Sequence, residues 1–410
     1  MAAKTKVTYP IFGKEEEKLV LKVLRSGKWW RGGTLKEMQA SVTGRFEKEY
    51  AKFTGAKHCL AVSNGTAAPE LALKAAGLGA GDEVLVPALS FVVTGTVPLL
   101  VNAVPVFVDI DPETYQMDPK DIERKITKKT RAILLVHYGG YPADMDRIIP
   151  LAKKHKLIVI EDCAHAQGTQ WRGKHAGTFG AAGTFSFQMS KAITSGEGGA
   201  IITNNKEMFY KCYSYHHIGR LEQKGFYDFF YPAWNYRLTE FQGALLLCQL
   251  RRYKKMVKEK HAAGVYLAAE LSKIGGVEPL KRDKRITRRG YYYFVIRYDA
   301  KHFNNLPRAD FLAALAKEGV ILGRGYGKPI YKEPLFQQGN FGNNSCPVKC
   351  SNYGKVMDYK KVCCPNAERA CAEEQVTLHH IQLGLGRKHL DKIIKAIIKV
   401  KAASWGKPIG

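Results

Sequence analysis

One segment of this sequence, from Thr184 to Thr203, has the residue types and the spacing that covalent chemistry needs. An apolar run leads to Lys191, a glycine-rich turn over 196–199 follows, and a second apolar run over 200–203 ends the segment. A lysine between two buried strands is partly desolvated, so it loses its proton readily and can act as an amine nucleophile. We therefore predict that Lys191 forms a Schiff base. The alternative is a solvated lysine in a hairpin loop.

An acidic residue follows a second buried strand. The sequence predicts a strand over Leu157–Glu161, and Asp162 comes directly after it. In parallel sheets ligands bind at the carboxyl ends of the strands, which would give Asp162 a ligand to contact. A helix N-cap is an equally simple interpretation of the same residue.

A third segment has the pattern of an anion-binding turn. The predicted strand 59–62 runs into the turn Ser63–Ala67, which opens a helix that extends to Leu78. Unpaired backbone N–H groups and the helix dipole face such a turn, and Thr66 adds a hydroxyl group. Many short turns between a strand and a helix contain glycine and threonine, so the pattern gains meaning only beside the lysine and the aspartate.

The surrounding elements alternate between strands and helices up to about residue 160. This alternation predicts a mainly parallel sheet with helices on both faces. We expect strands over 83–87, 104–108, 132–137 and 157–161, and helices near 90–101, 118–126 and 143–155.

The rhythm changes after a strongly apolar helix that begins at Leu238 and leads on to about Leu271. We expect a strand over 290–297, a helix over 308–318, a strand over 319–322 and a closing amphipathic helix over 390–400. The sequence therefore predicts a large domain over 1–250 and a smaller α+β domain over 251–410.

These features together match the needs of one cofactor, pyridoxal 5′-phosphate (PLP). Lys191 would form the imine, and Asp162 would keep the ring nitrogen protonated so that the ring acts as an electron sink. The turn at 63–67 would hold the phosphate, and Phe91 offers a flat apolar side chain to the ring. No single feature is sufficient, but the four form a coherent set.

The sequence also resembles the sugar and aminocyclitol aminotransferases of the DegT/StrS type, which have the PLP-dependent transferase fold type I. The resemblance runs from about Pro10 to Leu385 and implies an α/β fold with a seven-stranded sheet, PLP as cofactor and a homodimer with shared active sites. The matching motifs are SNGTAA (63–68), GDEVLVPALSFV (81–92), PVFVDIDPETY (105–115), EDCAHAQG (161–168), FSFQMSKAITSGEGGA (185–200) and NYRLTEFQGALLLCQL (235–250).

The resemblance assigns roles to individual residues. Lys191 would form the imine and later move the proton between the substrate carbon and the cofactor, and Asp162 would pair with the ring nitrogen. Histidine at 165 departs from the glutamine of many relatives near the phenolic oxygen. The other cofactor contacts would be Gly65, Thr66 and Ser186 on the phosphate, Phe91 on the ring and Asn235 on the phosphate of the neighbouring subunit.

Two groups within the family resemble different segments of this sequence. Segments 287–303, 328–336 and 378–380 resemble the glutamine-dependent scyllo-inosose aminotransferases, and segments 27–33 and 164–174 resemble the aminohydroxybenzoate synthases. The candidate substrate contacts, each of which could instead be a core or surface residue, are Arg31, Tyr138, His216, His217 and His379.

Amino transfer from L-glutamine or L-glutamate to the ketone of a sugar or cyclitol is the function that this resemblance implies. The acceptor could be a keto-inositol or a nucleotide-linked keto-sugar. The alternatives are a dehydrating and aromatising PLP enzyme and a non-catalytic regulatory protein of the same fold.

The composition excludes several other classes of protein. The 410 residues are 45% hydrophobic and 25% charged, which is typical of a soluble globular protein. The net charge of +27 is spread along the chain without a nucleic-acid-binding motif, and the most apolar stretch, 91–108, is interrupted by Pro98 and Pro105. Nine scattered cysteines without paired metal-ligand spacing predict free thiols, no metal site and, with no apolar leader after the first residues, a cytoplasmic protein.

Overall fold

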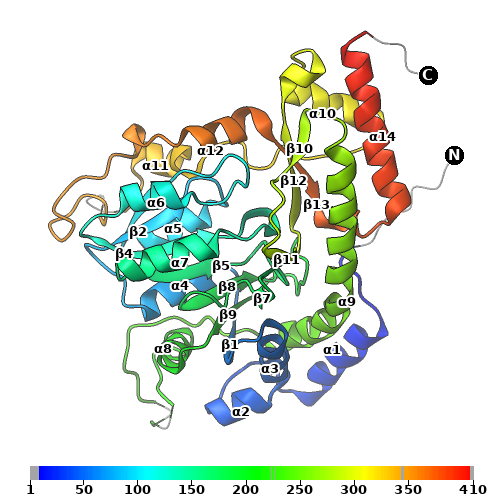
Figure 1. Ribbon diagram of the computed structural model, residues 1–410. Coiled ribbons are helices and arrows are strands. Elements are labelled where there is room, and N and C mark those ends of the chain that lie inside the picture. The colour runs from blue at the N-terminus through cyan, green and yellow to red at the C-terminus, as the bar shows by residue number, and fades with distance from the viewer. Residues whose placement is uncertain (1–8, 223, 226, 343–345, 407–410) are drawn as a thin grey trace.

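A computed structural model describes residues 9–222, 224–225, 227–342 and 346–406, and Figure 1 shows its two unequal parts. The larger part is built on a seven-stranded sheet in the order β1-β9-β8-β5-β4-β2-β3 within the described chain. All pairings from β3 to β8 are parallel, and β9 pairs antiparallel with β8 and β1. The strands are β1 (His58–Val62), β2 (Glu83–Pro87), β3 (Val104–Val108), β4 (Thr130–Val136), β5 (Ile158–Asp162), β8 (Ala182–Ser186) and β9 (Gly199–Thr203).

Strand β2 shows why these segments read as continuous apolar runs. Val84 and Val86 point into a core on one face of the sheet, and Leu85 points into a separate core on the other face. A strand that is covered on both sides needs apolar residues at every position rather than at alternate ones. The predicted bounds 83–87 and 104–108 are confirmed, and those of the other predicted strands of this sheet differ by one or two residues.

Helices cover both faces of this sheet, as the alternating pattern predicts. The helices on the face of Val84 are α4 (Ala67–Ala75), α5 (Val93–Leu100) and α8 (Lys206–His216), and those on the face of Leu85 are α6 (Pro119–Lys125) and α7 (Met145–Lys154). Asn205 starts α8 by accepting a hydrogen bond from the N–H of Met208, at 3.1 Å. Asp118 starts α6 in the same way.

Helix α9 (Glu240–Leu271) connects the two parts of the molecule. Its 32 residues extend over about 48 Å, and Thr239 and Gln242 form a capping box at its start. The N-terminal helix α1 (Lys14–Ser26) packs along α9, where Glu16 and Arg252 form an ion pair at 2.8 Å. The other N-terminal helices are α2 (Leu35–Ala40) and α3 (Val42–Thr54).

The smaller part is an antiparallel sheet in the order β10-β12-β13 with helices α10 and α14 against it. The predicted strand over 319–322 is wrong, because Gly319 ends α10 with a φ of +71° and Ile321 is exposed. Among the described residues, the segment after α10 pairs with β13 only through an isolated bridge between Gly323 and Thr377. These elements are β10 (Val277–Pro279), β12 (Tyr293–Tyr298), β13 (Gln375–His379), α10 (Arg308–Lys317), α13 (His380–Leu383) and α14 (Arg387–Ser404).

The chain beyond residue 250 divides its side chains between the two parts. Helices α11 (Pro334–Gln338) and α12 (Pro365–Arg369) pack with the large sheet, and Phe336 and Tyr359 are buried in its core. Part of the predicted small domain over 251–410 thus belongs structurally to the large part, because those side chains close the face of the sheet around Phe107.

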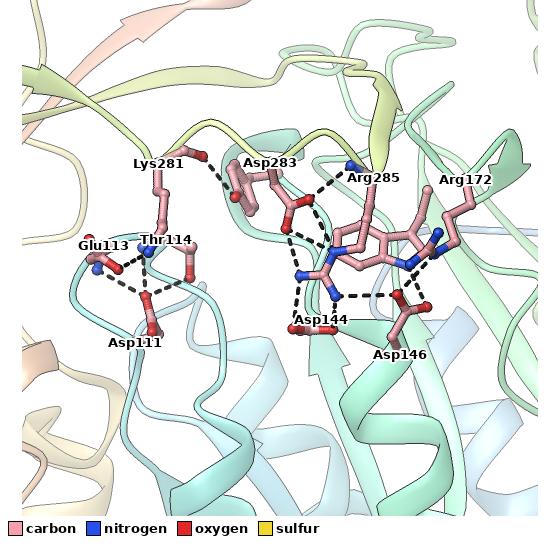
Figure 2. Close-up of polar contacts among 11 residues, drawn as sticks. Asp111, Glu113, Thr114, Asp144, Asp146, Arg172, Lys281, Asp283 and Arg285 are labelled. Atoms are coloured by element: carbon pink, nitrogen blue, oxygen red, sulfur yellow. Dashed lines mark hydrogen bonds and ion pairs between the residues drawn. The ribbon is translucent and has the colours of Figure 1, made fainter. Parts of the chain in front are cut away.

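A second link between the parts is the segment that leads from β10 to β11 (Ile286–Arg288), which Figure 2 shows in detail. Strand β11 pairs with β6 (Gln170–Trp171), and β6 pairs with β7 (Lys174–His175). Lys281 forms an ion pair with Glu113 at 2.5 Å, and the guanidinium of Arg285 lies 4.3 Å from the ring centroid of Trp171. The same guanidinium bonds three carboxylates, those of Asp144, Asp146 and Asp283. This segment fixes the small part against the large one.

No helix of the described chain is both long and apolar enough to span a bilayer.

Candidate active site

A cavity of about 480 Å³ opens where the carboxyl ends of the parallel strands meet the small part. The sequence-predicted residues that line it are Gly65, Thr66, Phe91, Asp162, His165, Ser186 and Lys191. These residues come from four separate stretches of the chain, and the parallel sheet brings them to one edge. The cavity is therefore a ligand site of the kind that this architecture provides.

Lys191 lies in the loop between β8 and β9, and its amine is 4.0 Å from the ring centroid of Tyr292. Burial lowers the pKa of Lys191 to about 8, although the negative charge of Asp162 works in the opposite direction. With that pKa, roughly a tenth of the amine is neutral at pH 7. Lys191 thus has the nucleophilic form available without a separate base.

Asp162 ends β5, and its carboxylate accepts a hydrogen bond from the N–H of Ala164 at 2.9 Å. Burial raises the pKa of Asp162, while that hydrogen bond and the positive charge of Lys191 favour the carboxylate. The N-cap interpretation of Asp162 is wrong, because turns rather than a helix follow it. The carboxylate lines the cavity and is available to a cationic group of a ligand.

The turn before α4 provides fewer free donors than the sequence pattern predicts. The side chain of Asn64 accepts hydrogen bonds from the backbone N–H groups of Thr66 and Ala67, at 3.0 and 2.8 Å. A Cβ on Gly65 would lie 2.5 Å from the Cβ of Ser186, so only glycine lets the turn approach β8 so closely. The hydroxyl groups of Thr66 and Ser186 remain at the cavity surface as donors to an anion.

His165 is buried and its imidazole stacks on the ring of Tyr292, with 4.2 Å between ring centroids and 19° between planes. Burial, together with the positive charge of Lys191, holds the pKa of His165 well below its ordinary value. The N–H of Gly139 points at Nδ1 at 3.4 Å, which leaves the ring proton on Nε2. His165 is therefore a neutral hydrogen-bond donor, and it can replace an amide side chain without adding charge.

Three tyrosines of the small part and its linker form a wall of the cavity that the sequence analysis missed. Tyr293 is the first residue of β12, Tyr292 directly precedes it, and Tyr326 follows the bridge at Gly323. The hydroxyl of Tyr292 lies 2.9 Å from that of Ser190, next to Lys191. Three consecutive tyrosines after Gly290 were a visible signal, but the sequence analysis used them only for a strand and for a family resemblance.

Arg31, His216 and His217 do not reach the cavity, which corrects their assignment as substrate contacts. Arg31 is 2% exposed, and its guanidinium bonds the carboxylate of Glu47 at 2.5 Å. His216 contacts a carbonyl of its own helix through Nδ1, and Nδ1 of His217 lies 3.1 Å from Arg237. Each of the three side chains has a polar partner in the core, although within the described chain one ring or guanidinium nitrogen of each is buried without one.

Tyr138 and His379 lie behind the wall rather than on it. The hydroxyl of Tyr138 accepts a hydrogen bond from the amide of Gln375 at 2.7 Å, and its ring packs against Tyr326. The ring of His379 lies 5.3 Å from that of Tyr292. These two predicted contacts are therefore supports of the wall in this chain.

Phe91 and Asn235 are the exposed members of the predicted set. Phe91 lies at the cavity mouth with 54% of its surface exposed, and its ring is 6.3 Å from that of Tyr326. Asn235 is exposed and forms a bridge with His217 outside the cavity. Asn235 is not among the residues that line the cavity of its own chain.

A buried cluster of His137, Glu161 and Cys163 has the composition of a metal site but no free ligand capacity. Glu161 accepts hydrogen bonds from three backbone N–H groups of the turn 177–180, each at 2.7 Å. His137 donates to Glu161 through Nε2 at 3.0 Å and accepts through Nδ1. These hydrogen bonds hold the turn 177–180 against β5 and account for the burial of Glu161 and His137 without a metal.

Comparisons with known proteins agree with this geometry. The model of the DegT/DnrJ/EryC1/StrS aminotransferase family matches residues 10–358. A Micromonospora echinospora protein with the provisional name L-glutamine:3-amino-2,3-dideoxy-scyllo-inosose aminotransferase is 38% identical over 87% of this chain and 85% of its own length. The L-glutamine:2-deoxy-scyllo-inosose aminotransferase of Streptomyces lividus is 36% identical over 89% of this chain and 87% of its own.

The solved structures confirm the predicted fold. The crystal structure of a 3-amino-5-hydroxybenzoic acid synthase superposes with a TM-score of 0.83 at 30% identity, over 97% of this chain and 98% of that one. The chain has the α/β fold type I of the PLP-dependent transferases, with the mainly parallel sheet described above.

Proposed function

This chain belongs to the DegT/DnrJ/EryC1/StrS aminotransferase family, and we propose that it transfers the amino group of L-glutamine to the ketone of a cyclitol with PLP as cofactor. The observation that carries the proposal is the joint position of the Lys191 amine and the Asp162 carboxylate in one cavity with the hydroxyls of Thr66 and Ser186. The names of the relatives at 34–38% identity support glutamine as donor and a keto-cyclitol as acceptor.

The residues of the cavity have the chemistry that PLP requires. Thr66 and Ser186 would hold the phosphate, Asp162 the ring nitrogen and His165 the phenolic oxygen, and Phe91 would lie near the ring. When bound, PLP supplies an electron sink that stabilises negative charge on the substrate carbon.

The protein's own part in the reaction is proton transfer and orientation. Lys191, with its pKa of about 8, can take a proton from the substrate carbon and return it at a neighbouring atom. The Asp162 carboxylate would stabilise a positive charge on the ring nitrogen of bound PLP. Neutral His165 would donate a hydrogen bond to the phenolic oxygen without adding a charge of its own. The tyrosine wall limits how the substrate can turn, which favours the geometry that proton transfer needs.

Two alternatives have less support. A dehydrating and aromatising reaction is suggested by the solved 3-amino-5-hydroxybenzoic acid synthase, at 30% identity against 36–38% for the inosose aminotransferases. A non-catalytic protein would have no need to keep Lys191, Asp162 and Thr66 together. L-Glutamate as donor and a nucleotide-linked keto-sugar as acceptor are variants of the main proposal.

A homodimer is part of the proposal. Exposed aromatic side chains at Trp29, Trp30 and Phe91 are of the kind that protein interfaces bury. Asn235 is exposed and does not line the cavity of its own chain, so it is available to a neighbouring subunit. The nine cysteines are all free, which supports the proposed cytoplasmic location.

The test is an absorbance titration of the protein with PLP, followed by separate additions of L-glutamine and L-glutamate. We expect a visible band in the wild type that disappears with glutamine, and neither event in Lys191→Ala, whose transfer rate should fall at least about 10³-fold. Keto-inositols should then restore the band in the wild type, and keto-sugars should not. A wild type without a band would favour the non-catalytic alternative. If glutamate alone bleaches the band, then L-glutamate and not L-glutamine is the amino donor. Loss of water from the acceptor would favour the aromatising reaction.

A further inference from the structure

A second lysine is buried behind the active site without a carboxylate. Lys260 of helix α9 is 3% exposed, and in the described part of the chain no carboxylate lies within 4.0 Å of its amine. Its neighbour Glu259 pairs with Lys255 instead. The amine lies 2.8 Å from Nδ1 of His380, a fully buried residue at the start of α13. A buried lysine is costly to the fold, and an apolar residue would fill the same space at lower cost.

The bond between Lys260 and His380 determines which nitrogen of the imidazole carries its proton. Burial lowers the pKa of Lys260 to about 8, so the amine is mainly protonated at neutral pH, and an ammonium group can only donate. Burial also holds the pKa of His380 well below its ordinary value, with the charge of Lys260 adding to the effect. The ring is therefore neutral, with Nδ1 as acceptor and the proton on Nε2.

The proton on Nε2 points at the active-site loop. Nε2 of His380 lies 3.0 Å from the carbonyl oxygen of Ser190, which belongs to the peptide group directly before Lys191. The carbonyl of Lys191 itself accepts a hydrogen bond from the hydroxyl of Tyr9. Both peptide groups that flank the Cα of Lys191 are thus held by side chains from outside the loop.

The loop needs such external support because it has no regular structure. Residues 187–198 lie between β8 and β9. Apart from one backbone bond at their base, from the N–H of Phe187 to the carbonyl of Gly198, turns and side chains rather than a neighbouring strand set their backbone. The amine of Lys191 is separated from its Cα by four rotatable bonds, and a change of the backbone moves it away from Asp162. Misplacement of a reacting group by about 1 Å can lower a rate by about 10²-fold.

We propose that Lys260 and His380 are positioning residues for the catalytic lysine, acting through the hydrogen bonds Lys260–His380 and His380–Ser190. This proposal rests on the proposed function, because it assigns Lys191 a role in catalysis. Neither residue lines the cavity, and the side-chain hydrogen bonds of the pair reach the catalytic loop at the Ser190 carbonyl. The small part of the molecule, which contributes His380, thereby holds a residue of the large part.

The experiment compares Lys260→Met, His380→Leu, His380→Gln and the double variant Lys260→Met/His380→Leu as full-length protein with PLP. Four quantities are measured for each: kcat, the KM for L-glutamine, the pH midpoint of the visible absorbance band and amide hydrogen exchange of residues 187–198 without PLP. Lys254→Met is the matched control, because Lys254 is on the same helix and pairs with Glu49 at the surface.

We expect Lys260→Met and His380→Leu each to lower kcat by about 10- to 100-fold with KM changed less than about twofold, and to shift the pH midpoint of the band. Hydrogen exchange in the loop should rise in both. His380→Gln keeps an N–H that can reach the Ser190 carbonyl and should regain most of kcat. The double variant should be no slower than His380→Leu, because Lys260 acts only through His380.

Two results would overturn the proposal. One is a lower Tm in these variants with kcat and the pH midpoint unchanged, which would mean that the pair serves stability alone. The other is a double variant whose loss equals the product of the two single losses. The pH midpoint can be measured even if the protein does not react with glutamine. It therefore tests the positioning role independently of the proposed amino donor. A wild type that forms no band with PLP would overturn both.

Discussion

The two sides of the active-site cavity are held in place in different ways. The floor consists of Lys191 on its loop and of residues at the ends of sheet strands, where the ladder fixes Asp162 opposite Thr184 on one side and opposite Val136 on the other. The wall consists of Tyr292, Tyr293 and Tyr326, which side-chain contacts hold against the floor. Backbone pairing fixes the position of a strand residue whatever its side chain is, whereas a single substitution can change the side-chain contacts that hold the wall.

The chemistry of the two sides differs in the same way. The floor carries the two charged groups of the proposed reaction, the Lys191 amine and the Asp162 carboxylate. The wall is neutral, since burial raises the pKa of Tyr293 and Tyr326 further above the physiological range. Neutral hydroxyl groups suit a polyol, because they donate and accept hydrogen bonds without drawing charge from the reacting centre. We infer that the floor supplies the reaction and the wall orients the substrate.

The largest effect should come from a residue behind the floor and should be on stability alone. Arg31→Ala leaves Glu47 buried without its partner and should lower the free energy of unfolding by about 3–5 kcal/mol, measured by denaturant unfolding. Lys154→Ala breaks an exposed ion pair with Glu123 and should change the free energy of unfolding by at most about 1 kcal/mol. If Arg31→Ala stayed stable but lost kcat, Arg31 would belong to the active site after all.

The next effect should be on the floor itself. Asp162→Asn removes the carboxylate that faces the cation in the cavity, and we expect kcat to fall by about 10²- to 10³-fold with the fold intact. Glu123→Gln, a carboxylate at the surface, is the control and should leave kcat unchanged. A loss in Asp162→Asn no greater than that of a wall variant would remove the distinction between floor and wall.

A smaller effect should follow from the wall. Tyr292→Phe keeps the ring beside Lys191 and His165 but loses the hydroxyl contact with Ser190, and should lower kcat by about 2- to 10-fold. Tyr298→Phe is its matched control, because the hydroxyl of Tyr298 also makes one hydrogen bond, at 2.7 Å to the carbonyl of Leu306, outside the cavity. Equal kcat values for the two variants would contradict the role of Tyr292.

The smallest effect on the reaction should come from His165→Gln. Because the imidazole is neutral, an amide that donates the same hydrogen bond should keep kcat within about threefold at pH 7.5. A much larger loss would show that ionisation of His165 takes part in the reaction.

The same variant gives a pH-dependent prediction for stability. The pKa of His165 lies well below 6.5 in the fold, so below pH 6.5 the unfolded chain binds more protons there, and the free energy of unfolding falls as pH drops. Urea unfolding at pH 7.5 and pH 5.5 should show a smaller loss in His165→Gln than in the wild type. An equal loss in the two proteins would mean that His165 titrates alike in both states.

Sequence patterns predicted the floor well because its signals are local. A buried strand followed by a polar residue places Asp162, and a strand, a small-residue turn and a helix place Gly65 and Thr66. The same patterns missed Asn64, whose side chain uses two of the donors expected for a ligand. Competition between a side chain and a ligand for the same N–H groups depends on rotamers, which residue types alone do not specify.

Long-range contacts decided the rest. Tyr292 stacks on His165, which is 127 positions earlier in the sequence, and the periodicity of a single helix or strand cannot predict such a contact. Arg31 and His217 are of residue types that often bind substrates. In the folded chain, Arg31 is paired with Glu47 and His217 with Arg237, and both are buried.

The sequence by itself determined the chemical groups of this protein and the secondary structure that carries them, since both depend on residue type and spacing. Only the tertiary structure decided which groups meet: the lysine with the tyrosine wall, and Lys260 with His380 behind the catalytic loop. The physical reason is that burial and partnership set the charge of a side chain, and both are properties of the folded chain.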